Sequence, residues 1–187
     1  MPAIDRSRIM ILATNGFEQS ELEVPLQKLR QAGAQVEIVS PKEGEIVGWE
    51  KKDWGSAVKV DRTVGDAEVS DYDALVLPGG QINPDLLRVD KPAVDFIRSF
   101  QATGKPVAAI CHAPWLLIEA GLVEGRRATS YHSIRTDMEN AGAKWEDSET
   151  VRDGNIITSR KPADLEAFVA AIVEAVEGDR ARRSAAE

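Results

Sequence analysis

Short apolar segments alternate along this chain with longer segments in which apolar residues recur every three or four positions. The short segments are rich in aliphatic residues and predict strands at 8–13, 35–40, 73–77, 107–110, 128–130 and 155–159. The longer segments predict helices at 20–32, 90–103, the stretch from 112 to Gly121, 134–140 and 162–176. This alternation is typical of a doubly wound (flavodoxin-like) α/β fold, in which helices sandwich a parallel sheet.

Residues 41–61 interrupt the alternation. Short segments there are separated by three glycines, Gly44, Gly48 and Gly55. Glycine punctuation at this spacing predicts a small antiparallel excursion instead of another helix. We expect Trp49 and Trp54, which lie within the excursion, to be packing residues.

The size and charge of the chain narrow the possible classes of protein. Its 187 residues have the length of one ordinary domain, so we predict a single domain over 1–178 and a mobile polar tail over 179–187. The formal net charge of −8 disfavours nucleic acid and anionic membranes as partners. No segment approaches the roughly 20 apolar residues that cross a bilayer, and the N-terminus has no signal-like apolar run, so a cytoplasmic location is expected.

Cys111 is the single cysteine, and it lies between the apolar run 107–110 and the helix-like segment 112–118. A buried strand that turns directly into a helix exposes its junction residue, as in the nucleophile elbow of α/β hydrolases. The small residues Ala109 and Ala113 flank that junction. Backbone N–H groups at the start of the helix would favour the thiolate, which predicts a lowered thiol pKa. The alternative is a buried cysteine that acts only as a small hydrophobe.

In a doubly wound sheet, ligands bind at the carboxyl ends of the strands. The loops 14–19 and 78–85 and Cys111 itself would meet at this edge. Gly79 and Gly80 allow a close backbone approach to a ligand, so the N–H groups of Gly80 and His112 could form an oxyanion hole. The alternative interpretation of the glycine pair is an ordinary turn.

The sequence offers no support for a metal or a cofactor. The cysteine and the two histidines, His112 and His132, do not have a metal-ligand spacing. No phosphate-binding glycine motif occurs either. We therefore predict no cofactor and no metal, and we expect His132 to be a surface residue.

Four motifs together resemble those of the PfpI family of intracellular cysteine peptidase-like proteins. They are Gly16–Glu18, Leu77–Gly80, Ala108–Pro114 and Ser159–Leu165. This family belongs to the class I glutamine amidotransferase-like superfamily, and the Parkinsonism-associated deglycase is a relative. The resemblance covers nearly the whole chain. At Ala113 the chain departs from the usual pattern, which has glycine after the histidine.

The resemblance implies a set of site residues. Cys111 would be the nucleophile, supported by His112, and Asp85 from a neighbouring subunit would orient that histidine. Many relatives have glutamate at the position of Asp85, and the alternative role for Asp85 is to cap the helix that follows. Glu18 would share a proton with the sulfur, or it would simply place a favourable charge before the first helix. Tyr131 would line the substrate pocket with Gly79.

Two functions remain open from the sequence. The first is a stress-protection hydrolase, either peptidase-like or a deglycase or glyoxalase acting on methylglyoxal adducts, with a site shared between the subunits of a homodimer or larger homo-oligomer. Its substrate would be a small-molecule or peptide-derived carbonyl compound. The second is a non-enzymatic redox sensor or holdase chaperone, in which Cys111 is oxidised to sulfinic acid that Glu18 stabilises.

Overall fold

A seven-stranded sheet forms the centre of the molecule in this computed structural model, which describes residues 3–184. Its strand order is β11-β12-β8-β7-β1-β3-β6, and only β11 runs antiparallel to its neighbour. The strands are β1 (Arg8–Leu12), β3 (Gln35–Ser40), β6 (Arg62–Thr63), β7 (Ala74–Leu77), β8 (Val107–Ile110), β11 (Thr150–Asp153) and β12 (Ile156–Ser159). The order β3-β1-β7-β8-β12 is doubly wound, which confirms the predicted fold class.

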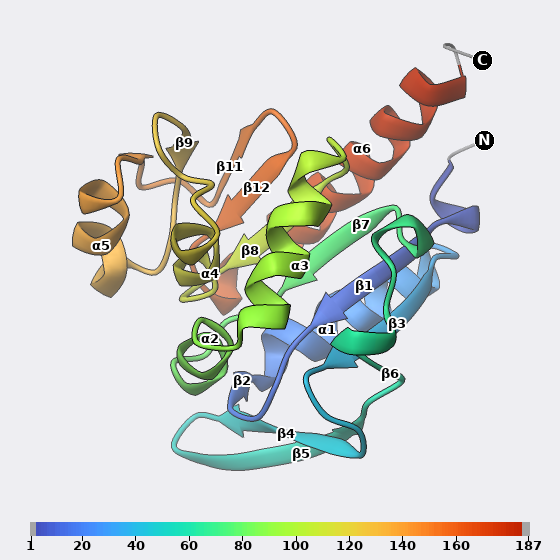
Figure 1. Cartoon of the computed structure of the whole chain (residues 1–187). Coiled ribbons are helices and arrows are strands. Elements are labelled where there is room, and N and C mark those ends of the chain that lie inside the picture. The colour runs from blue at the N-terminus through green and yellow to red at the C-terminus, as the bar shows by residue number, and fades with distance from the viewer. Residues whose placement is uncertain (1–2, 185–187) are drawn as a thin grey trace.

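Helices cover both faces of this sheet (Figure 1). On one face lie α1 (Gln19–Gln31) and α6 (Leu165–Ser184). On the other lie α3 (Lys91–Ala102) and α4 (Pro114–Glu119), next to the short α2 (Ile82–Leu87) and α5 (Arg135–Asn140). The strands are apolar on both sides because both sides are covered: in β1, Ile9 and Ile11 belong to one core cluster while Met10 and Leu12 belong to the other.

The excursion predicted for residues 41–61 is present as a hairpin. Strands β4 (Glu45–Glu50) and β5 (Asp53–Lys59) pair antiparallel, and β2 (Phe17–Glu18) pairs parallel with β4. Trp49 and Trp54 contact each other edge to face at 5.5 Å between ring centroids, but Trp54 is 53% exposed and therefore packs only in part.

The region after α4 differs most from the expectation. The strand expected at 128–130 is β9 (Arg127–Ala128), and it pairs with β10 (Lys144–Trp145) in a separate two-stranded sheet. A tight turn at Gly154 and Asn155 joins β11 to β12. The last helix continues to Ser184 and so includes part of the expected tail, while residues 185–187 lie outside the described residues. The mobility of the tail stays a prediction.

Short single-turn 3-10 helices occur at Ala3–Arg6, Val64–Asp66, Val69–Asp71, His132–Ile134 and Pro162–Asp164. Asp90 caps α3, because its side chain accepts the N–H of Ala93 at 2.9 Å. Asp85 lies inside α2 and not at its N-cap, which is Gln81, so the capping role considered for Asp85 is wrong. Within residues 3–184, no helix is long and apolar enough to cross a membrane.

Candidate active site

Cys111 lies at a sharp turn between β8 and α4, as the sequence predicts. Its φ angle is +65°, in the left-handed region that residues with a side chain rarely adopt. The backbone on both sides is tied down: the N–H of Cys111 donates to the carbonyl of Ser159 at 3.0 Å, and its own carbonyl accepts the N–H of Tyr131 at 2.8 Å. The strained conformation is thus held by neighbouring segments, which is typical of a functional position.

The backbone around the sulfur provides hydrogen-bond donors. The backbone N–H groups of Gly80 and His112 face the Cys111 sulfur and favour its ionised form. Gly80 has a φ of +82°, and a Cβ there would lie 2.4 Å from the carbonyl oxygen of Gly16. A Cβ at Gly79 would lie 2.7 Å from the Cβ of Cys111. Only glycine fits at these two positions, so the pair is more than an ordinary turn.

The acid that contacts the thiol is Glu21, not Glu18. Glu21 is fully buried, its Oε2 accepts the N–H of Gly79 at 2.9 Å, and its side chain interacts with the Cys111 thiol. Burial raises the pKa of Glu21 to about 8, so this carboxyl is protonated at neutral pH. Its Oε1 has no hydrogen-bond partner among the described residues. Glu18 instead accepts a hydrogen bond from the Ser20 hydroxyl at 3.2 Å.

A pattern in the sequence could have identified Glu21. It shares the buried face of α1 with Leu22, Pro25 and Leu29, at the three- and four-residue spacing of an amphipathic helix. A carboxylate in such an apolar stripe is rarely buried without a partner or a function. Glu18, just before the helix, lines the cavity next to it.

The His112 ring is fixed on several sides. Its Nδ1 lies 3.2 Å from the Cys111 sulfur, and its Nε2 lies 3.1 Å from the Ser133 hydroxyl oxygen. The ring stacks on Tyr131 at 4.9 Å and meets Trp115 edge to face at 5.3 Å. Burial, with a smaller contribution from the charge of His132, lowers the pKa of His112 to about 4. At pH 7 the imidazole is therefore neutral.

The pKa of the Cys111 thiol is raised, whereas the sequence predicts that it is lowered. Burial raises the pKa of Cys111, the charge of an ionised Glu21 raises it further, and the N–H donors of Gly80 and His112 oppose the shift only in part. The reason is that the thiol is only 6% exposed, and α4 begins three residues later, at Pro114. At neutral pH the site therefore holds a thiol, a neutral imidazole and a protonated carboxyl.

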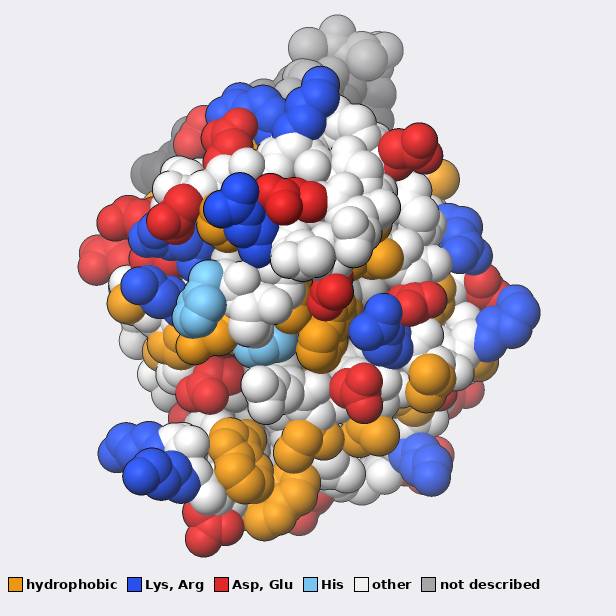
Figure 2. Space-filling model, turned by 90° about the vertical axis from the view of Figure 1, so that its left-hand side faces the viewer, with side chains coloured by type: hydrophobic (Ala, Val, Ile, Leu, Met, Phe, Trp, Pro, Cys, Tyr) orange, Lys and Arg blue, Asp and Glu red, His pale blue; other side chains and the backbone are white. Residues whose placement is uncertain are grey.

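These groups line a cavity of about 420 Å³ at the carboxyl edge of the sheet. Its lining residues are Gly16, Glu18, Glu21, Trp49, Lys51, Gly80, Gln81, Ile82, Cys111, His112, Tyr131 and Pro162. Figure 2 shows the face that carries both histidines, with hydrophobic side chains gathered beside and below them. The β4–β5 hairpin contributes Trp49 and Lys51 to the wall, so the excursion shapes the site. Gly79 lies behind the lining, against Glu21.

Within one chain, Asp85 does not reach this cavity. It is exposed on α2, and the group that contacts the outer nitrogen of His112 is Ser133, which the sequence analysis did not single out. His132 is exposed as expected, with its ring 4.4 Å from that of Tyr131. Among the described residues, no group of three or more histidine, cysteine and acidic side chains is arranged to hold a metal ion.

Known proteins are similar to this chain over the whole region that contains the site. A model of the DJ-1/PfpI family matches residues 7–175. Deglycase PfpI of Pyrococcus furiosus is 44% identical over 167 residues, which are 89% of this chain and 98% of that protein. General stress protein 18 of Bacillus subtilis is 43% identical over 162 residues, which are 86% of this chain and 92% of that protein.

Among solved structures, a two-domain protein from Anabaena variabilis, which contains DJ-1/ThiJ/PfpI-like and ferritin-like domains, resembles the present fold over part of its length. The TM-score is 0.86 at 38% sequence identity, and the match covers 90% of this chain and 48% of that one. The region matched by the family model includes every residue that lines the cavity.

Proposed function

Because the chain belongs to the DJ-1/PfpI family, we propose that it is a cysteine-dependent enzyme of the deglycase type. Its substrate would be a small carbonyl compound, above all an adduct of methylglyoxal with an amine or a thiol. The names of two relatives, a deglycase and a general stress protein, support this chemistry and a role in stress protection. The observation that carries the proposal is the sulfur of Cys111, which has two backbone donors and an imidazole nitrogen at 3.2 Å around it.

The residues around Cys111 supply the parts of such a reaction. The sulfur attacks the carbonyl carbon, and the electron pair of the C=O bond moves to the oxygen. The thiol proton passes to Nδ1 of His112, whose neutral state leaves it able to accept a proton. The N–H groups of Gly80 and His112 then stabilise the negative oxygen. Glu21, protonated and beside the sulfur, stabilises thiolate as it forms.

The overall reaction balances without an added oxidant or reductant. Hydrolysis of a methylglyoxal adduct consumes one water and releases the amine together with a 2-hydroxy acid. The carbon at the aldehyde level is oxidised while the neighbouring ketone carbon is reduced. The size of the cavity, about 420 Å³, suits a small adduct of this kind better than a folded polypeptide.

We also propose that the site is shared between two copies of the chain. Asp85 is exposed on α2, and three apolar side chains of the same helix and the turn after it are exposed beside it: Ile82, Leu86 and Val89. Such a surface suits a symmetric contact between two copies. In that assembly, Asp85 of one copy would help to orient His112 of the other.

The proposed activity is tested with the purified protein and its Cys111→Ser variant. The substrates are the hemithioacetal of methylglyoxal with N-acetylcysteine and a chromogenic peptide. We expect turnover of the hemithioacetal only, with a loss of more than about 1,000-fold in the variant. Cleavage of the peptide alone would indicate a peptidase. No turnover of either, together with stable sulfinic acid after mild peroxide, would favour the redox sensor, which the contact of Glu21 with the sulfur supports.

The shared site is tested by mixing subunits. Cys111→Ser and Asp85→Ala are each expected to lack most of the activity, and a mixture of the two should recover part of it. One site of a hybrid dimer would combine an intact Cys111 with an intact Asp85 from the other chain. If labelled subunits exchange and the activity does not return, the shared site is wrong.

A further inference from the structure

The outer nitrogen of the His112 ring contacts a hydroxyl from the same chain. Ser133 lies in the 3-10 helix His132–Ile134, and its Oγ is 3.1 Å from Nε2 of His112. On the opposite side of the ring, Nδ1 lies 3.2 Å from the Cys111 sulfur. The ring therefore connects the thiol to Ser133 in one line of hydrogen-bonding atoms.

We propose that Ser133 is a positioning residue, whose hydroxyl oxygen accepts the Nε2–H of His112 and so keeps the Nδ1 lone pair directed at the Cys111 sulfur. A neutral imidazole has one N–H and one lone pair, and a thiol needs the lone pair to give up its proton. In the other tautomer, Nδ1–H would face the S–H group and could not accept its proton. The neighbouring stacking on Tyr131 fixes the plane of the ring but does not select between tautomers.

A hydroxyl suits this position because it carries no charge. A carboxylate in contact with Nε2 would favour the imidazolium and raise the pKa of His112. Ser133 leaves the ring neutral, in agreement with the burial around it. Because a hydroxyl also donates, Ser133 can pass a hydrogen bond outward, and Asp85 of a second copy would be a suitable acceptor in the shared site.

The expected changes in kcat and KM rest on the proposed function, whereas the tautomer of His112 does not. The kinetics and the tautomer are therefore measured separately. The ¹⁵N chemical shifts of the imidazoles report which nitrogen carries the proton. The chain has only two histidines, and His132→Gln assigns the second ring. The variants are Ser133→Ala, the conservative Ser133→Thr, and Ser99→Ala as a control, since Ser99 is exposed on α3.

In the parent protein we expect Nε2 of His112 to carry the proton. Ser133→Ala should give a mixture of tautomers and lower kcat about tenfold, with KM changed less than about twofold, because the hydroxyl does not touch the substrate. Ser133→Thr should restore the tautomer and most of kcat, and Ser99→Ala should match the parent. An unchanged tautomer in Ser133→Ala overturns the inference, whatever its activity. If no variant or parent turns over the substrate, the proposed function fails while the tautomer still decides the role of Ser133.

Discussion

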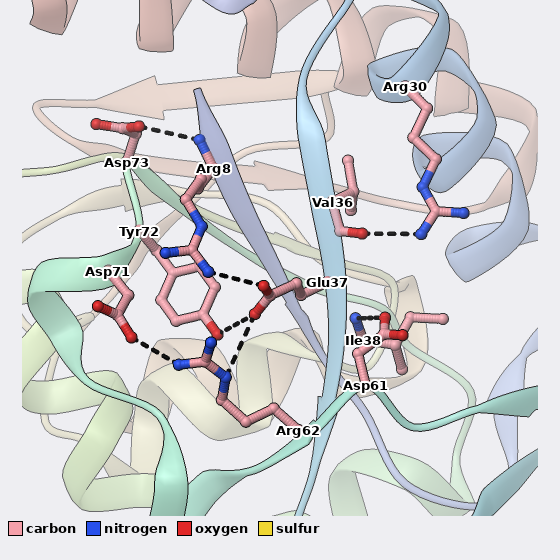
Figure 3. A network of polar contacts seen from close by, with 10 residues as sticks. All are labelled: Arg8, Arg30, Val36, Glu37, Ile38, Asp61, Arg62, Asp71, Tyr72 and Asp73. Atoms are coloured by element: carbon pink, nitrogen blue, oxygen red, sulfur yellow. Dashed lines mark hydrogen bonds and ion pairs between the residues drawn. The ribbon is translucent and has the colours of Figure 1, made fainter. Parts of the chain in front are cut away.

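Glu21 is buried and Glu37 is partly buried, but their surroundings shift the pKa values of the two carboxyl groups in opposite directions. Glu37 on β3 accepts hydrogen bonds from Arg8 at 2.7 Å and from the Tyr72 hydroxyl at 2.6 Å, with Arg62 at 3.6 Å (Figure 3). Burial opposes ionisation there, but these partners outweigh it and lower the pKa of Glu37. Among the described residues, the partners of Glu21 include no cation, and burial raises its pKa.

The difference separates a structural carboxylate from a chemical one. Figure 3 shows how Arg8, Arg62 and Tyr72 surround Glu37 and tie together β1, β3 and the segment before β7. The contacts of Glu37 with Arg8, Tyr72 and Arg62 connect neighbouring segments of the sheet and therefore stabilise the fold. Glu21 is held by a backbone N–H and contacts the thiol, and one of its oxygens has no hydrogen-bond partner among the described residues. Burial thus keeps a protonated carboxyl next to the sulfur at neutral pH.

The largest effect that tests this contrast is on activity. Glu21→Leu removes the donor beside the sulfur, so kcat/KM should fall about 100-fold, or about 2.7 kcal/mol. Glu21→Gln keeps a neutral N–H donor and should fall only about tenfold. Glu37→Gln, the matched change in the structural carboxylate, should stay within about twofold of the parent. Steady-state kinetics on the methylglyoxal hemithioacetal measure all three.

Thermal unfolding accompanies these assays, because Glu21→Leu could lose activity by unfolding. The Gln variants, which change shape least, then decide the comparison. Equal losses in Glu21→Gln and Glu37→Gln would show that the two carboxyls do not differ in the way proposed.

The sequence allowed much of this architecture to be predicted. Helices cover both faces of the sheet, so its strands are apolar on both sides, as with Ile9 and Met10 on opposite sides of β1. Uniformly apolar strands that alternate with amphipathic helices therefore predict the doubly wound sheet. The site at Cys111 follows from the break between an apolar run and a helix. The strand expected at 128–130 is present as the shorter β9, but its two-residue partner β10 could not be predicted, because two residues carry no periodicity.

Two features of the site could not be predicted because they depend on tertiary packing. The direction of the Cys111 pKa depends on burial, and the position of the thiol under the loop of Gly79 and Gly80 is set by tertiary packing. The contact of Ser133 with His112 joins a turn to a residue 21 positions earlier. Glu21 was missed for a different reason: the motif drew the assignment to Glu18, although the periodicity of α1 already places Glu21 on the buried face.

A second, smaller effect concerns stability. Glu37→Gln removes charge-assisted hydrogen bonds and should lower the free energy of unfolding at pH 7 by about 1–2 kcal/mol, the modest value expected because Arg8 and Glu37 remain partly exposed. The folded pKa of Glu37 is lowered, so its contribution is complete above about pH 4.5 and is lost as the pH falls through the folded pKa. Urea unfolding at pH 7 and pH 3 measures this, and a difference from the parent that is equal at both pH values would contradict it.

The last comparison is the opposite pH dependence of stability expected from Glu21. Its folded pKa is raised to about 8, so the folded state binds a proton that the unfolded state has already released above about pH 4.5. Unfolding therefore becomes easier as the pH rises from about 4.5 to about 8, whereas Glu37 contributes its full stability across the same range. Glu21→Gln cannot ionise and should flatten this decline, which for the parent amounts to about 3 kcal/mol between pH 5 and pH 8. Glu37→Gln should keep the slope of the parent, since Glu37 is ionised in both the folded and the unfolded state over that pH range.

Urea unfolding curves followed by the fluorescence of the four tryptophans give the free energy of unfolding at each pH. A parent protein whose stability does not fall across this window, or a Glu21→Gln variant that falls just as steeply, would mean that Glu21 is ionised in the folded chain and cannot be the donor to the sulfur.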